Sequence, residues 1–165
     1  MSRGRGYPER IVCLTEETTE TLYLLGEDWR IVGISGFTVR PPIARKEKPR
    51  VSAFTSAKID RIIALQPDLV LGFSDLQADI AADLVRAGVE VHVFNHRSVA
   101  EILRTIRVLG GMVGCEDKTL ALVTKLETGL AHARERAAAL TTRPTVYFEE
   151  WDEPQISAIR WVSEL

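Results

Sequence analysis

The stretch FTSAKIDRIIALQPDLVLGF, residues 54–73, decides the fold class of this chain. Its first half predicts a short helix, because three isoleucines have the i, i+3, i+4 spacing of one apolar face: Ile59, Ile62 and Ile63. Pro67 cannot continue that helix, and the run LVL that follows is apolar on both faces, as a central parallel strand must be. A helix that leads directly into a buried strand predicts an α/β fold around a parallel sheet.

The same alternation of apolar runs and helical patterns extends outward from this stretch. It predicts a parallel sheet of about four strands flanked by helices. The strands are expected at residues 11–14, 30–34, 69–71 and 89–94. A long segment, residues 35–54, contains the adjacent prolines Pro41 and Pro42. Because two prolines disfavour a helix, we expect an extended loop there, and its length suggests a functional role.

The region after the last predicted strand is mainly helical. Ser98 and Glu101 have the spacing of a capping box at the start of one helix. A second helical pattern runs from Glu116 to Leu140 and would be about 37 Å long, which is more than a small sheet requires. A predicted strand at 145–148 and a last apolar segment follow, and no later segment covers them. We therefore expect a chain that is truncated inside a second structural unit.

Composition and motifs argue against several classes of function. The 165 residues are 45% apolar with a net charge of −2, which suits one core and does not indicate nucleic acid as a partner. The start of the chain lacks a signal peptide, and the two distant cysteines do not indicate a disulfide. Since no known catalytic motif occurs, we expect no enzyme and no catalytic residue. His92 and His96 would converge only by chance, so neither a metal site nor a cofactor is expected.

Four stretches of the sequence together resemble a known family. They are LTEETTETLYLLG at 14–26, GFTVRPP at 36–42, PRVSAFTSAKIDRIIALQPDLVLGF at 49–73, and VYFEEW at 146–151 after the long helix. From Arg10 onward, the chain resembles the substrate-binding proteins of ABC importers for cobalamin, haem and ferric siderophores. Members of that family have two α/β lobes joined by one rigid helix, and they hold the ligand between the lobes.

The resemblance implies a division of the chain into three parts. An N-terminal ligand-binding lobe is expected at residues 10–115 and a connecting helix at 116–143. Residues 144–165 would be the incomplete beginning of the second lobe. The apolar side chains near the end of the chain then need cover, and a second copy of the same surface is the simplest partner, so we expect a homodimer.

Aromatic residues are the first candidates for a ligand site. In the cobalamin binders of the family, aromatic side chains on the loops after the strands form a wall against the ligand, and the matching positions are Phe37, Phe54 and Phe73. Their places agree with the rule that ligands of open α/β sheets lie beyond the carboxyl ends of the strands. Alternatively, these rings pack under the long proline loop. Trp151, from the second lobe, could close the cleft from the other side.

Charged residues near these positions bear on the identity of the ligand. Glu16 and Glu17 stand where many family members have Pro-Ser at the start of the first helix. They are either a charged first turn that the helix dipole stabilises, or acceptors for the amide side chains of a corrin, which would favour cobalamin. Arg40, Arg45 and Arg97 could instead pair with an anionic ligand.

Asp60 is the candidate for contact with the importer. It matches the carboxylate with which family members engage arginines of the membrane subunits, and it is one methylene shorter than the usual Glu. Alternatively, it is only a favourable charge near a helix N-terminus. Since the helix turns its isoleucines toward the core, we expect Asp60 to be exposed.

The resemblance thus implies a non-catalytic substrate-binding component of an ABC importer, located outside the cytoplasm, with cobalamin or a related corrinoid as ligand. Binding of haem or a ferric siderophore in the same fold is one alternative. A flavodoxin-like sensor or regulatory domain is another, and the start of the chain, which lacks a signal peptide, leaves that cytoplasmic alternative open.

Overall fold

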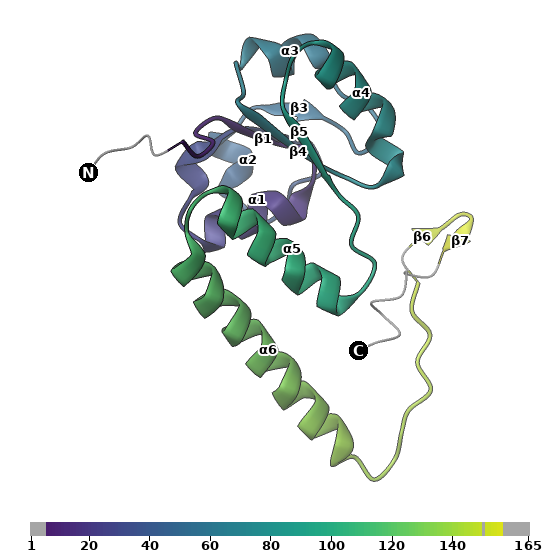
Figure 1. Ribbon diagram of the computed structural model, residues 1–165. Coiled ribbons are helices and arrows are strands. Elements are labelled where there is room, and N and C mark those ends of the chain that lie inside the picture. Colours follow the sequence, from purple (N-terminus) through teal and green to yellow (C-terminus); the bar gives the residue numbers. More distant parts are fainter. Residues whose placement is uncertain (1–5, 150, 157–165) are drawn as a thin grey trace.

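The computed structural model describes residues 6–149 and 151–156, and it confirms the expected α/β fold with a parallel sheet flanked by helices (Figure 1). The sheet has five strands in the order β3-β2-β1-β4-β5. Their bounds are Ile11–Cys13 for β1, Ile31–Ser35 for β2, Arg50–Ser52 for β3, Leu69–Phe73 for β4 and Val91–Phe94 for β5. Every residue of β1 is buried, because β1 is the central strand and side chains pack on both of its faces.

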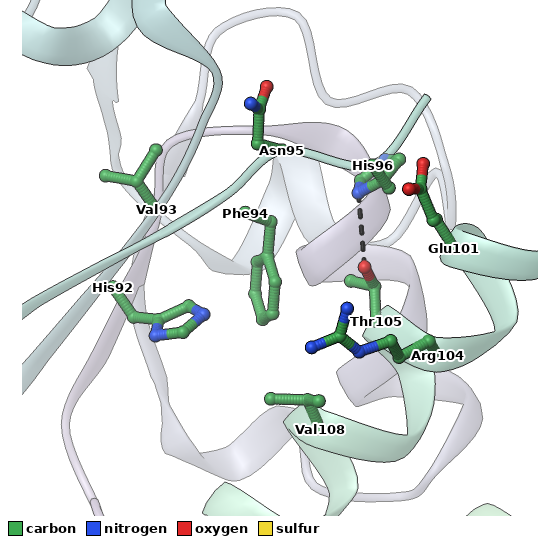
Figure 2. Close-up of a pocket in the computed structure, with 9 residues that line it drawn as sticks. All are labelled: His92, Val93, Phe94, Asn95, His96, Glu101, Arg104, Thr105 and Val108. Carbon is green, nitrogen blue, oxygen red and sulfur yellow. Dashed lines mark hydrogen bonds between the residues drawn. The ribbon is translucent and has the colours of Figure 1, made fainter. Parts of the chain in front are cut away.

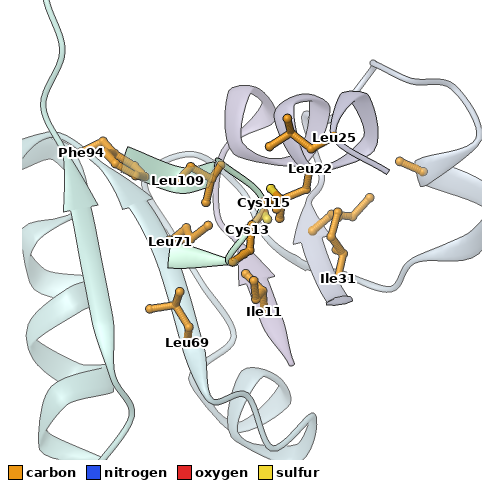
Figure 3. Close-up of a cluster of buried hydrophobic side chains, with 13 residues drawn as sticks. Ile11, Cys13, Leu22, Leu25, Ile31, Leu69, Leu71, Phe94, Leu109 and Cys115 are labelled. Carbon is orange, nitrogen blue, oxygen red and sulfur yellow. The ribbon is translucent and has the colours of Figure 1, made fainter. Parts of the chain in front are cut away.

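Helices cover both faces of this sheet. The bounds are Glu16–Leu24 for α1 and Val99–Met112 for α5 on one face, and Ile59–Ala64 for α3 and Ala78–Arg86 for α4 on the other. On the first face, Leu22 of α1 and Leu109 of α5 belong to one apolar cluster with β1 and β4 (Figure 3). On the second face, Ile62 of α3 and Leu84 of α4 pack against the same two strands. Side chains that alternate along β1 and β4 therefore contribute to both cores.

Both cysteines are free thiols in the core. Cys13 of β1 and Cys115 belong to the cluster shown in Figure 3. Burial raises the pKa of the Cys13 thiol to about 12, although the neighbouring hydroxyls of Thr18 and Thr19 partly oppose the shift. The same cause raises the pKa of Cys115. Both residues therefore act as small apolar side chains at neutral pH.

Residues 35–54 contain two elements that the prolines did not indicate. Helix α2 (Ala44–Glu47) begins two residues after Pro42, and β3 pairs with β2 at the edge of the sheet. The expectation of an uninterrupted extended loop was wrong, and the expected sheet was one strand short. A three-residue strand in which Val51 alone is buried has no periodic pattern, so only pairing with β2 defines it.

Two other local expectations were also wrong. Ile63 of α3 is 40% exposed, because this six-residue helix directs only Ile62 fully into the core. Residues 145–148 form no strand in the described part of the chain, and Val146 and Tyr147 are 76% and 71% exposed. A short antiparallel pair follows instead, formed by β6 (Trp151–Asp152) and β7 (Gln155–Ile156).

The long helix is present as α6 (Glu116–Ala138), two residues shorter at its C-terminal end than expected. Its first half packs on α5, with Val123 buried. Residues 131–140 are exposed, and the helix projects away from the sheet (Figure 1). The segment that suggested a homodimer lies mostly at 157–165, outside the described residues.

A buried cluster of charges ties the start of α6 to the sheet. Glu27 is 8% exposed, and its carboxylate accepts hydrogen bonds from Arg30 at 2.9 Å and from Lys118 of α6 at 2.8 Å. Arg30, at the end of the short helix η1 (Asp28–Arg30), also donates to the carbonyl of Val113 at 3.2 Å. Burial opposes ionisation of Glu27, but the hydrogen bonds and charges of Lys118 and Arg30 prevail and lower its pKa. These contacts set the direction in which α6 leaves the lobe.

Candidate ligand-binding site

The carboxyl ends of the five parallel strands lie along one edge of the sheet. From β1 the chain proceeds to β2 and β3 on one side, then crosses to β4 and β5 on the other. The order of the strands therefore reverses between β1 and β4, and in open α/β sheets such a switch point is where ligands bind. We define the strand-end surface as the last residue of β4 together with the segments that follow the strands: residues 14–16, 36–43, 53–58, 73–75 and 95–98.

The first turn of α1 lies at this switch point, and both of its carboxylates have partners within the chain. Glu16 Oε1 accepts a hydrogen bond from the backbone N–H of Val39 at 3.0 Å. Glu17 Oε1 accepts one from the Thr15 hydroxyl at 2.6 Å. Thr15 occupies the N-cap position, but its side chain caps no backbone N–H of α1. Burial raises the pKa of Glu17, and the hydrogen bond from Thr15 only partly offsets this effect.

Contacts from α1 also hold the loop that follows β2. Besides the hydrogen bond of Val39 to Glu16, the guanidinium of Arg40 lies 3.2 Å from a carboxylate oxygen of Glu20. The Arg40 side chain is 73% exposed, so this ion pair adds little stability but neutralises a cation near the site. Phe37 lies in the same loop and is 60% exposed.

The three aromatic residues predicted to form a ligand wall all lie at or next to the carboxyl ends of strands. Phe37 follows β2, Phe54 follows β3, and Phe73 is the last residue of β4. Phe37 is largely exposed, whereas Phe54 and Phe73 are half-buried, and Phe73 packs against the core. Their placement at one edge of the sheet agrees with the expectation drawn from the sequence. The role of each ring in ligand binding stays a prediction.

Phe73 has a cationic neighbour that the sequence did not place beside it. The guanidinium carbon of Arg97 lies 4.8 Å from the centroid of the Phe73 ring. The centroids of the Phe73 and His96 rings are 4.6 Å apart. Arg97 also approaches Asp75, at 3.7 Å. The loop after β5 thus contributes a positive charge to the aromatic region, because β4 and β5 are adjacent strands. Of the three arginines considered from the sequence, Arg97 contacts a predicted wall residue.

Gln77 joins three segments of the strand-end surface, and no pattern in the sequence singles it out. It is 1% exposed and ends the short helix η2 (Asp75–Gln77). Its side-chain N–H group donates to the carbonyl of Phe54 at 2.8 Å and to the carbonyl of Leu14 at 3.4 Å. Its Oε1 accepts a hydrogen bond from the backbone N–H of Phe73 at 2.9 Å. One amide therefore connects the ends of β1, β3 and β4.

Ser74 directs the chain from β4 toward Gln77. Its backbone, at φ 60° and ψ 176°, has a conformation that residues other than glycine rarely adopt. The Ser74 N–H donates to the carbonyl of Phe94 at 2.8 Å, and its hydroxyl accepts from the N–H of Leu76 at 3.3 Å. Such conformations cost about 1–3 kcal/mol and cluster at functional sites. The turn places Gln77 beneath the strand ends.

The capping box at the start of α5 is also present at this edge. Ser98 Oγ accepts a hydrogen bond from the N–H of Glu101 at 3.2 Å. Glu101 Oε2 accepts a short hydrogen bond, at 2.6 Å, from the N–H of Arg97. The capping contacts therefore hold the backbone of the residue whose guanidinium lies over Phe73.

Two predicted site residues lie away from these contacts. Asp60 is the second residue of α3 and is exposed, as expected from the isoleucine pattern. Its proposed contact with an importer stays a prediction. Trp151 begins β6, but the placement of its side chain lies outside the described part of the structure, so its position relative to the strand-end surface stays open.

Among residues 6–149 and 151–156, no group of three or more His, Cys, Asp and Glu side chains could hold a metal ion. His92 and His96 both lie beside α5, but no third ligand accompanies them in the described residues. The described helices also include none that is both long and apolar enough to cross a membrane.

Taken together, these features define one lobe of an α/β ligand-binding protein, with an open strand-end surface and a projecting helix. The chain belongs to the periplasmic binding protein family, which it matches over residues 11–165. This is a family of solute-binding proteins.

Three known proteins illustrate the relationship. An uncharacterized ABC transporter substrate-binding lipoprotein of Bacillus subtilis is 28% identical over 155 residues, which is 90% of this chain and 49% of the relative. The vitamin B12-binding protein of Pectobacterium atrosepticum is 23% identical over 145 residues, 86% of this chain and 52% of that protein. The periplasmic haem-binding protein of Roseiflexus has a similar structure, with a TM-score of 0.76 and 27% identity over 87% of this chain and 57% of that one. The chain spans about half the length of the curated relatives it matches.

Proposed function

We propose that the strand-end surface binds a large macrocycle, cobalamin or a related corrinoid, for delivery to an ABC importer. The observation that carries this proposal is the gathering of Phe37, Phe54 and Phe73 at one edge of the sheet. Aromatic rings offer flat apolar area that suits a macrocyclic face better than a small polar solute. The vitamin B12-binding relative from Pectobacterium supports the same class of ligand.

Haem or a ferric siderophore is the second candidate, and Arg97 favours it. A guanidinium beside Phe73 would pair with the carboxylates of haem or with an anionic iron chelate. The haem-binding protein from Roseiflexus supports this alternative. Against it, Glu16 and Glu17 lie at the same edge, and ionised carboxylates would repel an anion. Because both of them already accept hydrogen bonds within the chain, they favour a corrin only where their remaining oxygen atoms are accessible.

Calorimetric titration with cobalamin, haem and a ferric hydroxamate tests this proposal. We expect cobalamin to bind most tightly and Phe54→Ala to weaken it about tenfold, because truncating one buried aromatic contact costs roughly 1–2 kcal/mol. Leu24→Ala is the matched control, since Leu24 is 60% exposed on α1 and outside the strand-end surface. Tighter binding of the hydroxamate or of haem than of cobalamin would contradict the proposal that the ligand is a corrinoid. An unchanged ligand affinity in Phe54→Ala would mean that the Phe54 ring only packs within the protein.

We also propose that the protein works outside the cytoplasm and that Asp60 contacts the membrane subunits of the importer. Asp60→Ala should weaken binding to the detergent-solubilised importer about tenfold and leave ligand affinity unchanged, since one charge pair is lost away from the ligand. Asp117→Ala is a suitable control, because Asp117 is likewise an exposed carboxylate in the first turn of a helix, α6. Equal losses of importer affinity in both variants would mean that Asp60 acts only through the overall charge of the protein and makes no specific contact with the importer.

A further inference from the structure

A hollow lies between the edge strand β5 and helix α5, and its lining includes none of the residues named in the proposed function (Figure 2). It has a volume of about 260 Å³. Its walls are residues 92–96, from β5 and the loop that follows it, and four residues of α5. This hollow extends along β5 away from the strand-end surface, and Asn95 and His96 are the residues that lie at both.

Regular spacing on both elements creates the hollow. On β5, His92 and Phe94 are two residues apart, and both side chains point toward α5 (Figure 2). On α5, the lining residues have the i, i+3, i+4, i+7 spacing of one helix face: Glu101, Arg104, Thr105 and Val108. This face lies beside the apolar stripe that packs on the sheet. The site is therefore built on two regular elements instead of a loop.

Two charged side chains line the hollow, the guanidinium of Arg104 and the carboxylate of Glu101. Figure 2 shows the Arg104 side chain directed into the space between Phe94, Thr105 and Val108. Among the described residues, Arg104 makes no hydrogen bond and no ion pair, in contrast to Arg107, which lies 2.8 Å from the carboxylate of Glu127. The lining carboxylate, Glu101, accepts the hydrogen bond from the N–H of Arg97 that caps α5. Arg104 thus remains available for an external anion.

Flat rings form the rest of the wall. The His92 ring packs edge-on against Phe94, with 4.4 Å between the ring centroids. His96 Nδ1 lies 3.2 Å from the Thr105 hydroxyl. Burial lowers the pKa of both histidines, and the charge of Arg97 lowers that of His96 further, so both imidazoles are neutral at pH 7. The hollow therefore combines the guanidinium of Arg104 with apolar ring faces and neutral hydrogen-bonding groups, and its one lining carboxylate, Glu101, is held by the N–H of Arg97.

We propose that this hollow binds a small aromatic carboxylic acid, with the carboxylate on Arg104 and the flat body against His92 and Val108. A guanidinium matches a carboxylate in a two-point contact, and the ring faces match an apolar body. A phosphate would pair with the guanidinium of Arg104 but has no apolar body to pack against the rings. The volume admits a molecule of about ten non-hydrogen atoms, for which dissociation constants near ~1 mM are expected.

The test is a titration of the isotopically labelled chain followed by amide chemical shifts, with benzoate as probe. We expect saturable shifts in β5 and α5 near ~1 mM, and at least tenfold weaker effects with benzamide, which has the same size but no charge. Inorganic phosphate should cause no saturable shift. No saturation with benzoate by about 10 mM, equal binding of benzamide, or tighter binding of phosphate would overturn the proposal.

Variants separate this site from the strand-end surface. Arg104→Gln should abolish saturable benzoate binding, whereas Arg107→Gln, three residues further along the same helix, should retain it. Phe37→Ala, in the loop after β2, should also retain it, since Phe37 is not part of the lining. Arg104 is exposed, so its substitution should leave the fold intact, which circular dichroism checks. Unchanged benzoate affinity in Arg104→Gln would show that this guanidinium does not hold the carboxylate, and the proposal would be wrong.

Discussion

Replacing Gly110 with alanine should lower the free energy of unfolding by about 1–3 kcal/mol, whereas the same change at the next residue should raise it by about 0.5–1 kcal/mol. A Cβ atom at Gly110 would lie 1.9 Å from Thr119 Oγ1 and 2.7 Å from Thr119 Cβ. At Gly111, a Cβ atom would meet nothing within 4 Å. Both glycines lie in α5, so the loss of backbone freedom in the unfolded chain is the same for both, and the contact with α6 decides the sign.

Urea unfolding of Gly110→Ala and Gly111→Ala measures this difference. Opposite shifts of the two midpoints at equal m-values are the expected result. The double variant Gly110→Ala with Thr119→Ala should recover only part of the lost stability, because the contact with Thr119 Oγ1 is removed but the Cβ atom of residue 119, at 2.7 Å, remains. A neutral Gly110→Ala would mean that α6 can shift away from α5 at little cost, and the close approach of these helices would then contribute little to stability.

Gln77→Glu should lower the free energy of unfolding by about 2–3 kcal/mol at pH 7 and should weaken ligand binding more than the loss of stability alone would. The substitution keeps the shape of the side chain but removes the donor to the carbonyls of Phe54 and Leu14. It also places a charge where the side chain is 1% exposed. The ends of β1 and β3 would then lose their common hydrogen-bond donor, and the ring of Phe54 would lose its fixed position.

The pH dependence of Gln77→Glu provides a specific signature. A buried carboxyl has a higher pKa in the folded state than in the unfolded state, so the folded state binds the proton more tightly. The stability of Gln77→Glu relative to the parent protein should therefore be greatest at pH values below the pKa that this carboxyl has in the unfolded state. It should be lost as the pH rises through the pKa that the carboxyl has in the folded state. When protonated, the carboxyl can again donate one hydrogen bond, which adds to the recovery at low pH.

The control for this variant is Leu84→Ala, which removes a buried side chain from the same α4 region and should cost about 2–5 kcal/mol without touching the strand ends. If Gln77 positions the wall, cobalamin affinity should fall in Gln77→Glu and stay unchanged in Leu84→Ala at temperatures where both variants are folded. Equal cobalamin affinities in Gln77→Glu and Leu84→Ala would mean that Gln77 contributes to stability and not to positioning the ligand wall.

The sequence by itself determined the alternation of strands and helices, the buried character of the strands around LVL, and the length of α6 to within two residues. These features rest on periodicity within one segment, which local side-chain patterns encode directly. It also predicted that Phe37, Phe54 and Phe73 lie in loops at one edge of the sheet, because parallel strands joined by helices bring their carboxyl ends to one edge, although the strand before Phe54 was not predicted.

Tertiary structure alone decided the features that depend on pairing between distant segments. The strand β3 exists because Arg50 and Ser52 pair with β2, and Gln77 matters because it lies beneath the ends of β1 and β3 as well as β4. Arg97 contacts Phe73 because β4 and β5 are neighbours in the sheet. Each of these contacts joins residues that local periodicity does not relate, since the order of strands is set by how both faces of the sheet are covered and not by any one segment.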